Sequence, residues 1–243
     1  MQKIFYIYRI IIKVLSFINF GIGSILLSLL LSILFIFKPR RLVSFFFAIF
    51  VWQMRLLGGL TLKINNKNIL KNLHSKIIVA NHPSLLDVVL LISMIPNADC
   101  IVNGLLGKRN ILRIIVNNMY ISNELDFAEI SNRVANSLSK GNNVIIFPEG
   151  TRSIPGKPME LKKGAARLAL ETGYDILPVH IGGNEKIGLR KHDALLSFHP
   201  TQRYHYVFDI FPPISIDEYK QMPSGAASKH LTDKIKFTIL PNL

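Results

Sequence analysis

Apolar residues are unevenly distributed along the chain, and the longest uninterrupted apolar run lies near the amino terminus. The run from Val14 to Phe37 is 24 residues long and contains no charged side chain, so it can cross a membrane as a helix. A signal peptide would have a shorter apolar region followed by small residues at a cleavage site, whereas the basic segment 38–41 follows here. The pattern therefore predicts a membrane helix that is retained.

A second apolar run, from Leu42 to Met54, is too short to span a bilayer on its own. It is typical of an interfacial or re-entrant helix. Arg40 and Arg41 favour a cytoplasmic position for the end of the first run, but basic residues also flank its beginning. Two topologies remain open: a full span, and a hairpin that dips into one leaflet with both of its ends in the cytoplasm.

Beyond these runs, short apolar segments rich in β-branched residues alternate with helical patterns. Near-continuous apolar segments of this kind are typical of strands buried on both faces. The predicted strands are 60–64, 76–80, 99–103, 119–122, 143–147 and 176–181. The predicted helices are 84–95, 105–118, 126–140 and 161–172. The tail is expected to add an edge strand at 203–211 and a covering helix at 226–240.

Strands and helices in alternation predict an α/β fold, with a mainly parallel sheet and flanking helices. In this interpretation residues 1–59 form the membrane-associated helices and residues 60–243 form the α/β domain. We expect the protein at the membrane, with the α/β domain on its cytoplasmic face.

Charge supports the membrane assignment through its placement along the chain. The net charge is +14, yet none of the 15 acidic residues precedes Asp87. A cationic excess beside a membrane segment is attracted to anionic lipid headgroups, at about 1 kcal/mol per well-placed Lys or Arg. A basic chain can also indicate nucleic-acid binding, but no binding motif accompanies the charge, so no nucleic-acid partner is expected. Cys100 is the single cysteine, which excludes an intrachain disulfide and a cysteine metal cluster.

The first candidate for chemistry is the pair His82 and Asp87, which follows a predicted strand. On one continuous helix these residues would lie about 140° apart around the axis and would not meet. They can meet if His82 lies on the strand-to-helix turn and Asp87 lies one turn into the helix, and Pro83 suits the first turn of that helix. Asp87 would then bind one imidazole nitrogen and leave the other as a base. Taken alone, this spacing is weak evidence, because a lone histidine is more often structural.

The second candidate is the segment 143–153, which reads NVIIFPEGTRS. A buried strand that ends in polar residues places them at the carboxyl edge of the sheet, where open α/β folds bind ligands. Arg152 offers a planar fork for phosphate oxygens, and Gly150 allows a ligand to approach the backbone. On its own the segment fits a β-turn with a surface Glu–Arg ion pair equally well.

Together, the two segments resemble the glycerophosphate and lysophospholipid acyltransferase family, which includes the 1-acylglycerol-3-phosphate acyltransferases. The first family motif, N-H-x-S-x-x-D, is matched by Asn81, His82, Ser84 and Asp87, and the third, F-P-E-G-T-R-S, by residues 147–153. The fourth motif, an apolar stretch around a proline, resembles residues 176–181. The Lys-Lys-Gly that often follows the third motif is present as Lys162, Lys163 and Gly164.

The resemblance implies a reaction and a role for each motif. His82 would act as general base on an acceptor hydroxyl that attacks the thioester of acyl-CoA or acyl carrier protein, a contribution on the order of 10²–10⁴-fold. Asp87 would orient the imidazole. The residues implied to bind the polar head of a lysophospholipid acceptor are Glu149, Gly150, Thr151, Arg152, Lys162 and Lys163. The resemblance implies membrane lipids as partners, and no cofactor, metal ion or acyl-enzyme.

One position departs from the family pattern. The second motif usually ends in an arginine that binds phosphate, and the matching position here is Asn123. The expected acceptor is 1-acylglycerol-3-phosphate, which would give phosphatidic acid, with Arg152, Lys162 and Lys163 compensating for the missing arginine. The alternatives are a different acceptor in a specialised lipid pathway, a membrane-bound thioesterase or hydrolase that uses the same His–Asp pair, and a non-catalytic basic binding protein.

Overall fold

The computed structural model describes residues 2–34, 39–102, 119–154 and 156–240, and within these residues seven strands form one sheet. The strands are β1 (Leu60–Asn65), β2 (Ile77–Ala80), β3 (Ala98–Val102), β4 (Tyr120–Ser122), β5 (Asn143–Ile146), β6 (Ile176–Gly183) and β7 (Tyr204–Ile210). Their order across the sheet is β1-β7-β6-β2-β5-β3-β4. All neighbouring pairs are parallel except β6 and β7, which are antiparallel.

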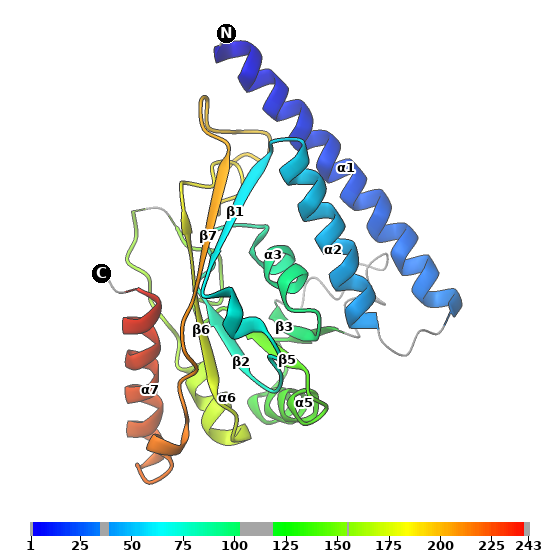
Figure 1. The fold of residues 1–243 in the computed structure, drawn as a ribbon. Helices are drawn as coiled ribbons and strands as arrows, with labels where there is room; N and C mark the ends of the chain where they lie inside the picture. The colour runs from blue at the N-terminus through cyan, green and yellow to red at the C-terminus, as the bar shows by residue number, and fades with distance from the viewer. Residues whose placement is uncertain (1, 35–38, 103–118, 155, 241–243) are drawn as a thin grey trace.

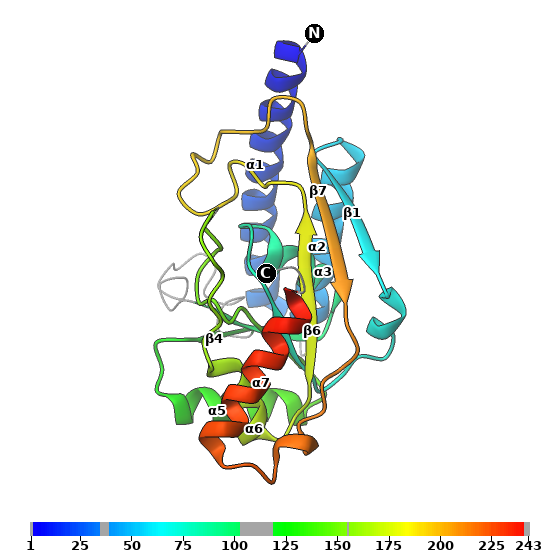
Figure 2. The same cartoon turned by 90° about the vertical axis from the view of Figure 1, so that its left-hand side faces the viewer.

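Helices cover both faces of the sheet (Figures 1 and 2). On one face lie α1 (Gln2–Leu34), α2 (Pro39–Leu56) and α3 (Asp87–Met94), and on the other lie α5 (Phe127–Ser139), α6 (Gly164–Thr172) and α7 (Ser224–Ile239). The short 3-10 helices η1 (Lys67–Leu70) and η4 (Asp217–Tyr219) lie in connections. The predicted α/β fold with a mainly parallel sheet is confirmed.

Local sequence signals explain where several helices begin and end. The Asp126 carboxylate accepts a hydrogen bond from the backbone N–H of Glu129 and so caps the start of α5. Gly141 follows the end of α5 with φ 81°, and Gly173 ends α6 with φ 78°. These left-handed conformations favour glycine, because a side chain at such φ values is strained against its own backbone.

The tail strand was predicted as an edge strand, and this was wrong. β7 lies between β1 and β6, so the edges of the sheet within the described residues are β1 and β4. Tyr204, Tyr206 and Phe208 are buried on one face of β7, while His205 on the other face is exposed. The alternation of apolar and polar residues therefore reflected one open face of the strand, and it carried no information about which strands pair with its edges.

The helix after β2 is shorter than the sequence predicted. The helix predicted at 84–95 begins at Asp87, so Pro83 lies outside it and Asp87 is its first residue, not a residue one turn inside it. Residues 84–86 form a turn before the helix instead. The helix predicted at 105–118 lies outside the described residues.

The amino-terminal helices have one apolar surface that the described chain leaves exposed. Within the described residues one helix is long and apolar enough to cross a membrane, over Gln2–Leu27 with a mean hydropathy of 2.1. Large apolar side chains such as Phe5 and Ile18 on α1 are more than half exposed, as is Trp52 on α2. The other side of α1 is anchored: Lys13 is 1% exposed, and its Nζ donates hydrogen bonds to the carbonyls of Gly188 and Ser197.

An ion pair joins α2 to the sheet. The Arg40 guanidinium donates from Nε and Nη2 to the two oxygens of Asp99 on β3, at 2.6 and 3.0 Å. Ser137 on α5 donates to the same carboxylate. The Asp99 side chain is only 5% exposed. Burying its negative charge would be costly without the hydrogen bonds from Arg40 and Ser137.

We predict that Arg40→Met lowers the free energy of unfolding by about 2–3 kcal/mol, because it leaves a buried carboxylate without its cation. Arg41→Met is the matched control, since Arg41 is the neighbouring residue and is exposed; we expect it to stay within about 0.5 kcal/mol of wild type. Denaturant titration of the protein in detergent measures both. Equal stabilities for the two variants would contradict this account of the ion pair.

Candidate active site

The two sequence motifs meet at one edge of the sheet because they follow neighbouring strands. β2 and β5 pair in parallel, with Ile77 opposite Val144, so both strands end at the same carboxyl edge. His82 lies two residues after β2, and the turn that begins at Phe147 directly follows β5. The structure therefore brings together side chains that are more than 60 residues apart in sequence.

The His82 ring is hydrogen-bonded to Asp87, as the motif predicted. Nδ1 of His82 lies 2.8 Å from Oδ2 of Asp87, and the Asp87 side chain is fully buried while that of His82 is 16% exposed. An ionised carboxylate can only accept hydrogen bonds, so Nδ1 carries the ring proton. On a neutral ring, Nε2 is then unprotonated and can act as a base.

Asp87 is itself fixed by Ser84. The Ser84 hydroxyl donates to Oδ1 at 2.5 Å, and the Ser84 backbone N–H donates to Oδ2 at 2.7 Å. Asp87 is also the first residue of α3, where the helix dipole favours a negative charge. These contacts compensate the cost of burying the carboxylate.

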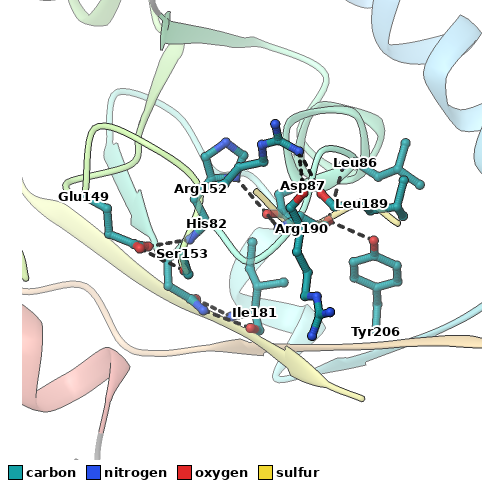
Figure 3. Close-up of polar contacts among 12 residues, drawn as sticks. His82, Leu86, Asp87, Glu149, Arg152, Ser153, Ile181, Leu189, Arg190 and Tyr206 are labelled. Atoms are coloured by element: carbon teal, nitrogen blue, oxygen red, sulfur yellow. Dashed lines mark hydrogen bonds and ion pairs between the residues drawn. The ribbon is translucent and has the colours of Figure 1, made fainter. Parts of the chain in front are cut away.

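A second carboxylate joins the two turns (Figure 3). Oε1 of Glu149 accepts the backbone N–H of His82 at 2.7 Å, and Oε2 accepts the Ser153 hydroxyl at 2.8 Å. The backbone N–H of Ser153 in turn donates to the carbonyl of His82 at 2.7 Å. We call this set of three hydrogen bonds the clasp. Burial raises the pKa of the Glu149 carboxyl, although the hydrogen bonds from Ser153 and His82 lower it.

His82 lies on the wall of a cavity of about 880 Å³. The His82 ring stacks on Phe147, with ring centroids 4.1 Å apart. Further apolar lining residues come from strands, from the turn before α3 and from helices on both sides of the sheet, including Phe20, Phe50 and Phe127. The sequence did not identify the phenylalanines of α1 and α2 as cavity residues, because a membrane-facing helix and a cavity-lining helix show the same apolar pattern.

Most of the residues predicted to bind substrate line this cavity, namely Gly150, Thr151, Arg152 and Lys162. Gly150 has φ 70°, and a Cβ there would approach Lys162 Nζ to 3.0 Å. Nη1 of Arg152 donates to the carbonyls of Leu189 and Arg190 at 3.0 and 3.1 Å. Two cationic side chains, Arg152 and Lys162, therefore line the same cavity as His82.

Two of the predicted substrate-binding residues do not line the cavity, whereas Asn123 does. Glu149 and Lys163 are not among the cavity-lining residues: Glu149 belongs to the clasp, and Lys163 is the exposed residue that precedes α6. Asn123 follows β4 and does line the cavity. The position at which the family pattern has an arginine thus belongs to this site.

Two residues outside the predicted set also support the site. The Asn81 side chain bonds both the N–H and the carbonyl of Ile181, which fixes the end of β2 against β6. The Tyr206 hydroxyl lies 2.8 Å from Ser84 Oγ. Asn81 is part of the first motif, but for Tyr206 the sequence indicated only burial.

Comparison with known proteins agrees with this geometry. A sequence model of the family described as Acyltransferase matches residues 61–182. The chain belongs to this acyltransferase family. It is 32% identical to a 1-acyl-sn-glycerol-3-phosphate acyltransferase of Cocos nucifera over 156 residues, which cover 60% of this chain and 47% of the relative, so the match spans about half of that protein. It is 27% identical to a protein of the same name from Salmonella typhimurium over 229 residues, or 88% of this chain and 84% of the relative.

The fold of this acyltransferase family member also matches a solved structure. The crystal structure of the 1-acyl-sn-glycerophosphate (LPA) acyltransferase PlsC from Thermotoga maritima superposes with a TM-score of 0.71. The match covers 98% of this chain and 96% of the other at 21% identity. The comparison shows that the two proteins share a fold.

The clasp gives a testable prediction. Glu149→Ala should lower the free energy of unfolding by about 1–3 kcal/mol, because the His82 N–H loses its acceptor in a partly buried site. Glu149→Gln should lose less, since its amide oxygen can still accept that N–H. Glu160→Ala, an exposed acid in the same segment, is the control. Denaturant titration measures all three, and an Ala variant as stable as the Gln variant would exclude a structural role for the carboxylate.

Proposed function

We propose that this protein is an acyltransferase that moves a fatty acyl group from a thioester to a hydroxyl of a lysophospholipid. The observation that carries the proposal is the position of His82: its ring is bound through Nδ1 to a buried Asp87 and lies at an apolar cavity that also contains Arg152 and Lys162. Membership of the acyltransferase family and the names of the relatives support it.

The cavity suits a lipid substrate. Its volume of about 880 Å³ lies within the usual range for ligand sites. Its aromatic and aliphatic walls suit an acyl chain, while Arg152 and Lys162 suit phosphate oxygens. A hydrolase that uses water would have no need for these two cations, and a simple binding protein would have no need for the His–Asp pair.

The proposed reaction is a direct transfer. The acceptor hydroxyl oxygen attacks the thioester carbonyl carbon while its proton moves to Nε2 of His82, and Asp87 stabilises the imidazolium that forms. The tetrahedral intermediate then collapses, the carbon–sulfur bond breaks, and the leaving thiolate takes the proton from the imidazolium. The products are an ester and a thiol, and the histidine is regenerated. As proposed, the reaction uses no cofactor or metal ion, and Cys100 is fully buried on β3.

For the acceptor we propose 1-acylglycerol-3-phosphate, which gives phosphatidic acid, with acyl-CoA or acyl carrier protein as donor. The names of the relatives and the two cations at the cavity support this choice. Asn123 supports the alternative, an acceptor with a different head group, because a neutral amide lies at the cavity where the family pattern has an arginine.

We propose that the protein acts at the membrane with the α/β domain on the cytoplasmic face. The exposed apolar side chains of α1 and α2 support contact with lipid, and the same helices line the cavity through Phe20 and Phe50. A lipid acceptor would then reach His82 from the bilayer.

An acceptor assay on purified protein in detergent tests the proposal. With labelled acyl-CoA or acyl carrier protein as donor, we expect ester formation on lysophosphatidic acid, and a loss of at least about 10³-fold in kcat for His82→Ala without loss of the fold by circular dichroism. Activity of His82→Ala near that of wild type would contradict the mechanism.

The same assay separates the two acceptors. If the lysophosphatidic acid assignment is right, wild type prefers this acceptor over lysolipids without a phosphate monoester, and Asn123→Arg lowers its KM further, by roughly tenfold. Asn123→Gln is the neutral control. Preference of the wild type for another lysolipid would overturn the phosphatidic acid assignment but keep the acyl transfer.

A further inference from the structure

The hydrogen bonds of the His82–Asp87 pair continue beyond Asp87 to the sheet. Ser84 Oγ lies 2.5 Å from Oδ1 of Asp87 and 2.8 Å from the hydroxyl oxygen of Tyr206 on β7. All three side chains are fully buried. Four residues from two distant parts of the sequence are therefore linked by consecutive hydrogen bonds: His82, Asp87, Ser84 and Tyr206.

The direction of these hydrogen bonds follows from the donors and acceptors available. Asp87 accepts from the His82 ring, the Ser84 N–H and the Ser84 hydroxyl, as an ionised carboxylate does. Ser84 has one hydroxyl hydrogen, which goes to Asp87, so Tyr206 is the donor to Ser84 Oγ. Burial raises the pKa of Tyr206 well above 10, and the charge of Asp87 raises it further. The phenol therefore keeps its hydrogen.

A buried lysine lies against the Tyr206 ring. Lys186 is 3% exposed, its Nζ is 4.5 Å from the ring centroid, and it donates to the carbonyls of Gly182, Asn184 and His205. Burial lowers the pKa of Lys186 to about 8, although attraction to Asp87 raises it. A cation at the ring face is held there by the ring electrons.

We propose that Tyr206 is a positioning residue for the His82–Asp87 pair and acts through Ser84. This inference rests on the proposed function, in which His82 is the base. The Tyr206–Ser84 bond keeps the serine hydroxyl on Oδ1, so that Oδ2 remains aligned with Nδ1 of His82. The hydrogen bonds from Tyr206 to Ser84 and from Ser84 to Oδ1 also draw the negative charge of the Asp87 carboxylate toward Oδ1 and away from the imidazole.

Loss of the Tyr206 hydroxyl should therefore have two effects. The carboxylate keeps more negative charge on the side of His82, so the ring holds its proton to higher pH. The Ser84 hydroxyl is also held less firmly on Oδ1 of Asp87, so the carboxylate is aligned less well with the imidazole and the rate of transfer falls. Among the described residues, Glu149 interacts electrostatically with both His82 and Asp87, and Lys186 interacts with Asp87. Both residues are unchanged in this variant.

The test compares Tyr206→Phe with Tyr204→Phe. Tyr204 is on the same strand and face and is equally buried, but its hydroxyl donates to the carbonyl of Ile187 at 2.7 Å. NMR of histidine-labelled protein follows the titration of the His82 ring, assigned by the signal that His82→Ala lacks. We expect the midpoint to move to higher pH in Tyr206→Phe and to stay at the wild-type value in Tyr204→Phe.

Steady-state kinetics gives a second readout. We expect Tyr206→Phe to lower kcat by roughly three- to tenfold, to change KM less than about twofold, and to move the acidic limb of the pH profile to higher pH. In a Ser84→Ala background the tyrosine substitution should have no further effect on the titration, because Tyr206 acts only through Ser84.

Three results would overturn the inference: an unchanged midpoint in Tyr206→Phe, an equal change in Tyr204→Phe, or a full additional effect in the Ser84→Ala background. The NMR titration requires no turnover, so it judges the role of Tyr206 independently of the acceptor assay. If no acceptor is acylated by wild type, the proposed function fails while the titration still decides whether Tyr206 controls the pair.

Discussion

The arrangement of the site depends on the clasp between the turns that follow β2 and β5. Glu149 accepts the backbone N–H of His82 and the hydroxyl of Ser153, and the N–H of Ser153 returns to the His82 carbonyl. Because the two strands are parallel neighbours, both turns begin at the same edge, and the clasp sets how far apart they lie. It places the His82 ring beside the cavity and leaves Asp87 free to bind Nδ1. A carboxylate that a motif-based view would assign to substrate binding is therefore used here to hold the backbone of His82.

One loop connects this site to the amino-terminal helices. The carbonyl of Leu189 accepts hydrogen bonds from Arg152 and from the backbone N–H of Leu85, and the neighbouring Gly188 carbonyl accepts from Lys13 on α1. The helix with the exposed apolar surface is thus joined, through two consecutive residues, to the turn of the first motif and to the arginine of the third. The same helices supply Phe20 and Phe50 to the cavity wall. A change in the position of α1 would act directly on both Arg152 and the apolar wall of the cavity.

Most of the fold could be predicted from periodicity, because strands such as β2 and β5 are buried on both faces. Asp126 at the start of α5 and Gly173 at the end of α6 add local capping signals. The motif residues also predicted that His82 and Asp87 meet. Other features depend on contacts between distant segments, which a local pattern does not record. The interior position of β7 is one, since alternation reports an open face and not the partners of a strand. The role of Glu149 in the clasp and the bond from Tyr206 to Ser84 are others.

The central claim is that Asp87 holds the His82 ring in the tautomer whose Nε2 can take the proton of the substrate hydroxyl. The most direct measurement is the kcat of Asp87→Asn, which keeps the shape of the side chain but cannot accept from Nδ1–H, Ser84 N–H and Ser84 Oγ as a carboxylate does. The account predicts a fall in kcat of roughly 10³–10⁴-fold with the fold retained. A folded variant that keeps more than about a tenth of wild-type kcat would contradict it.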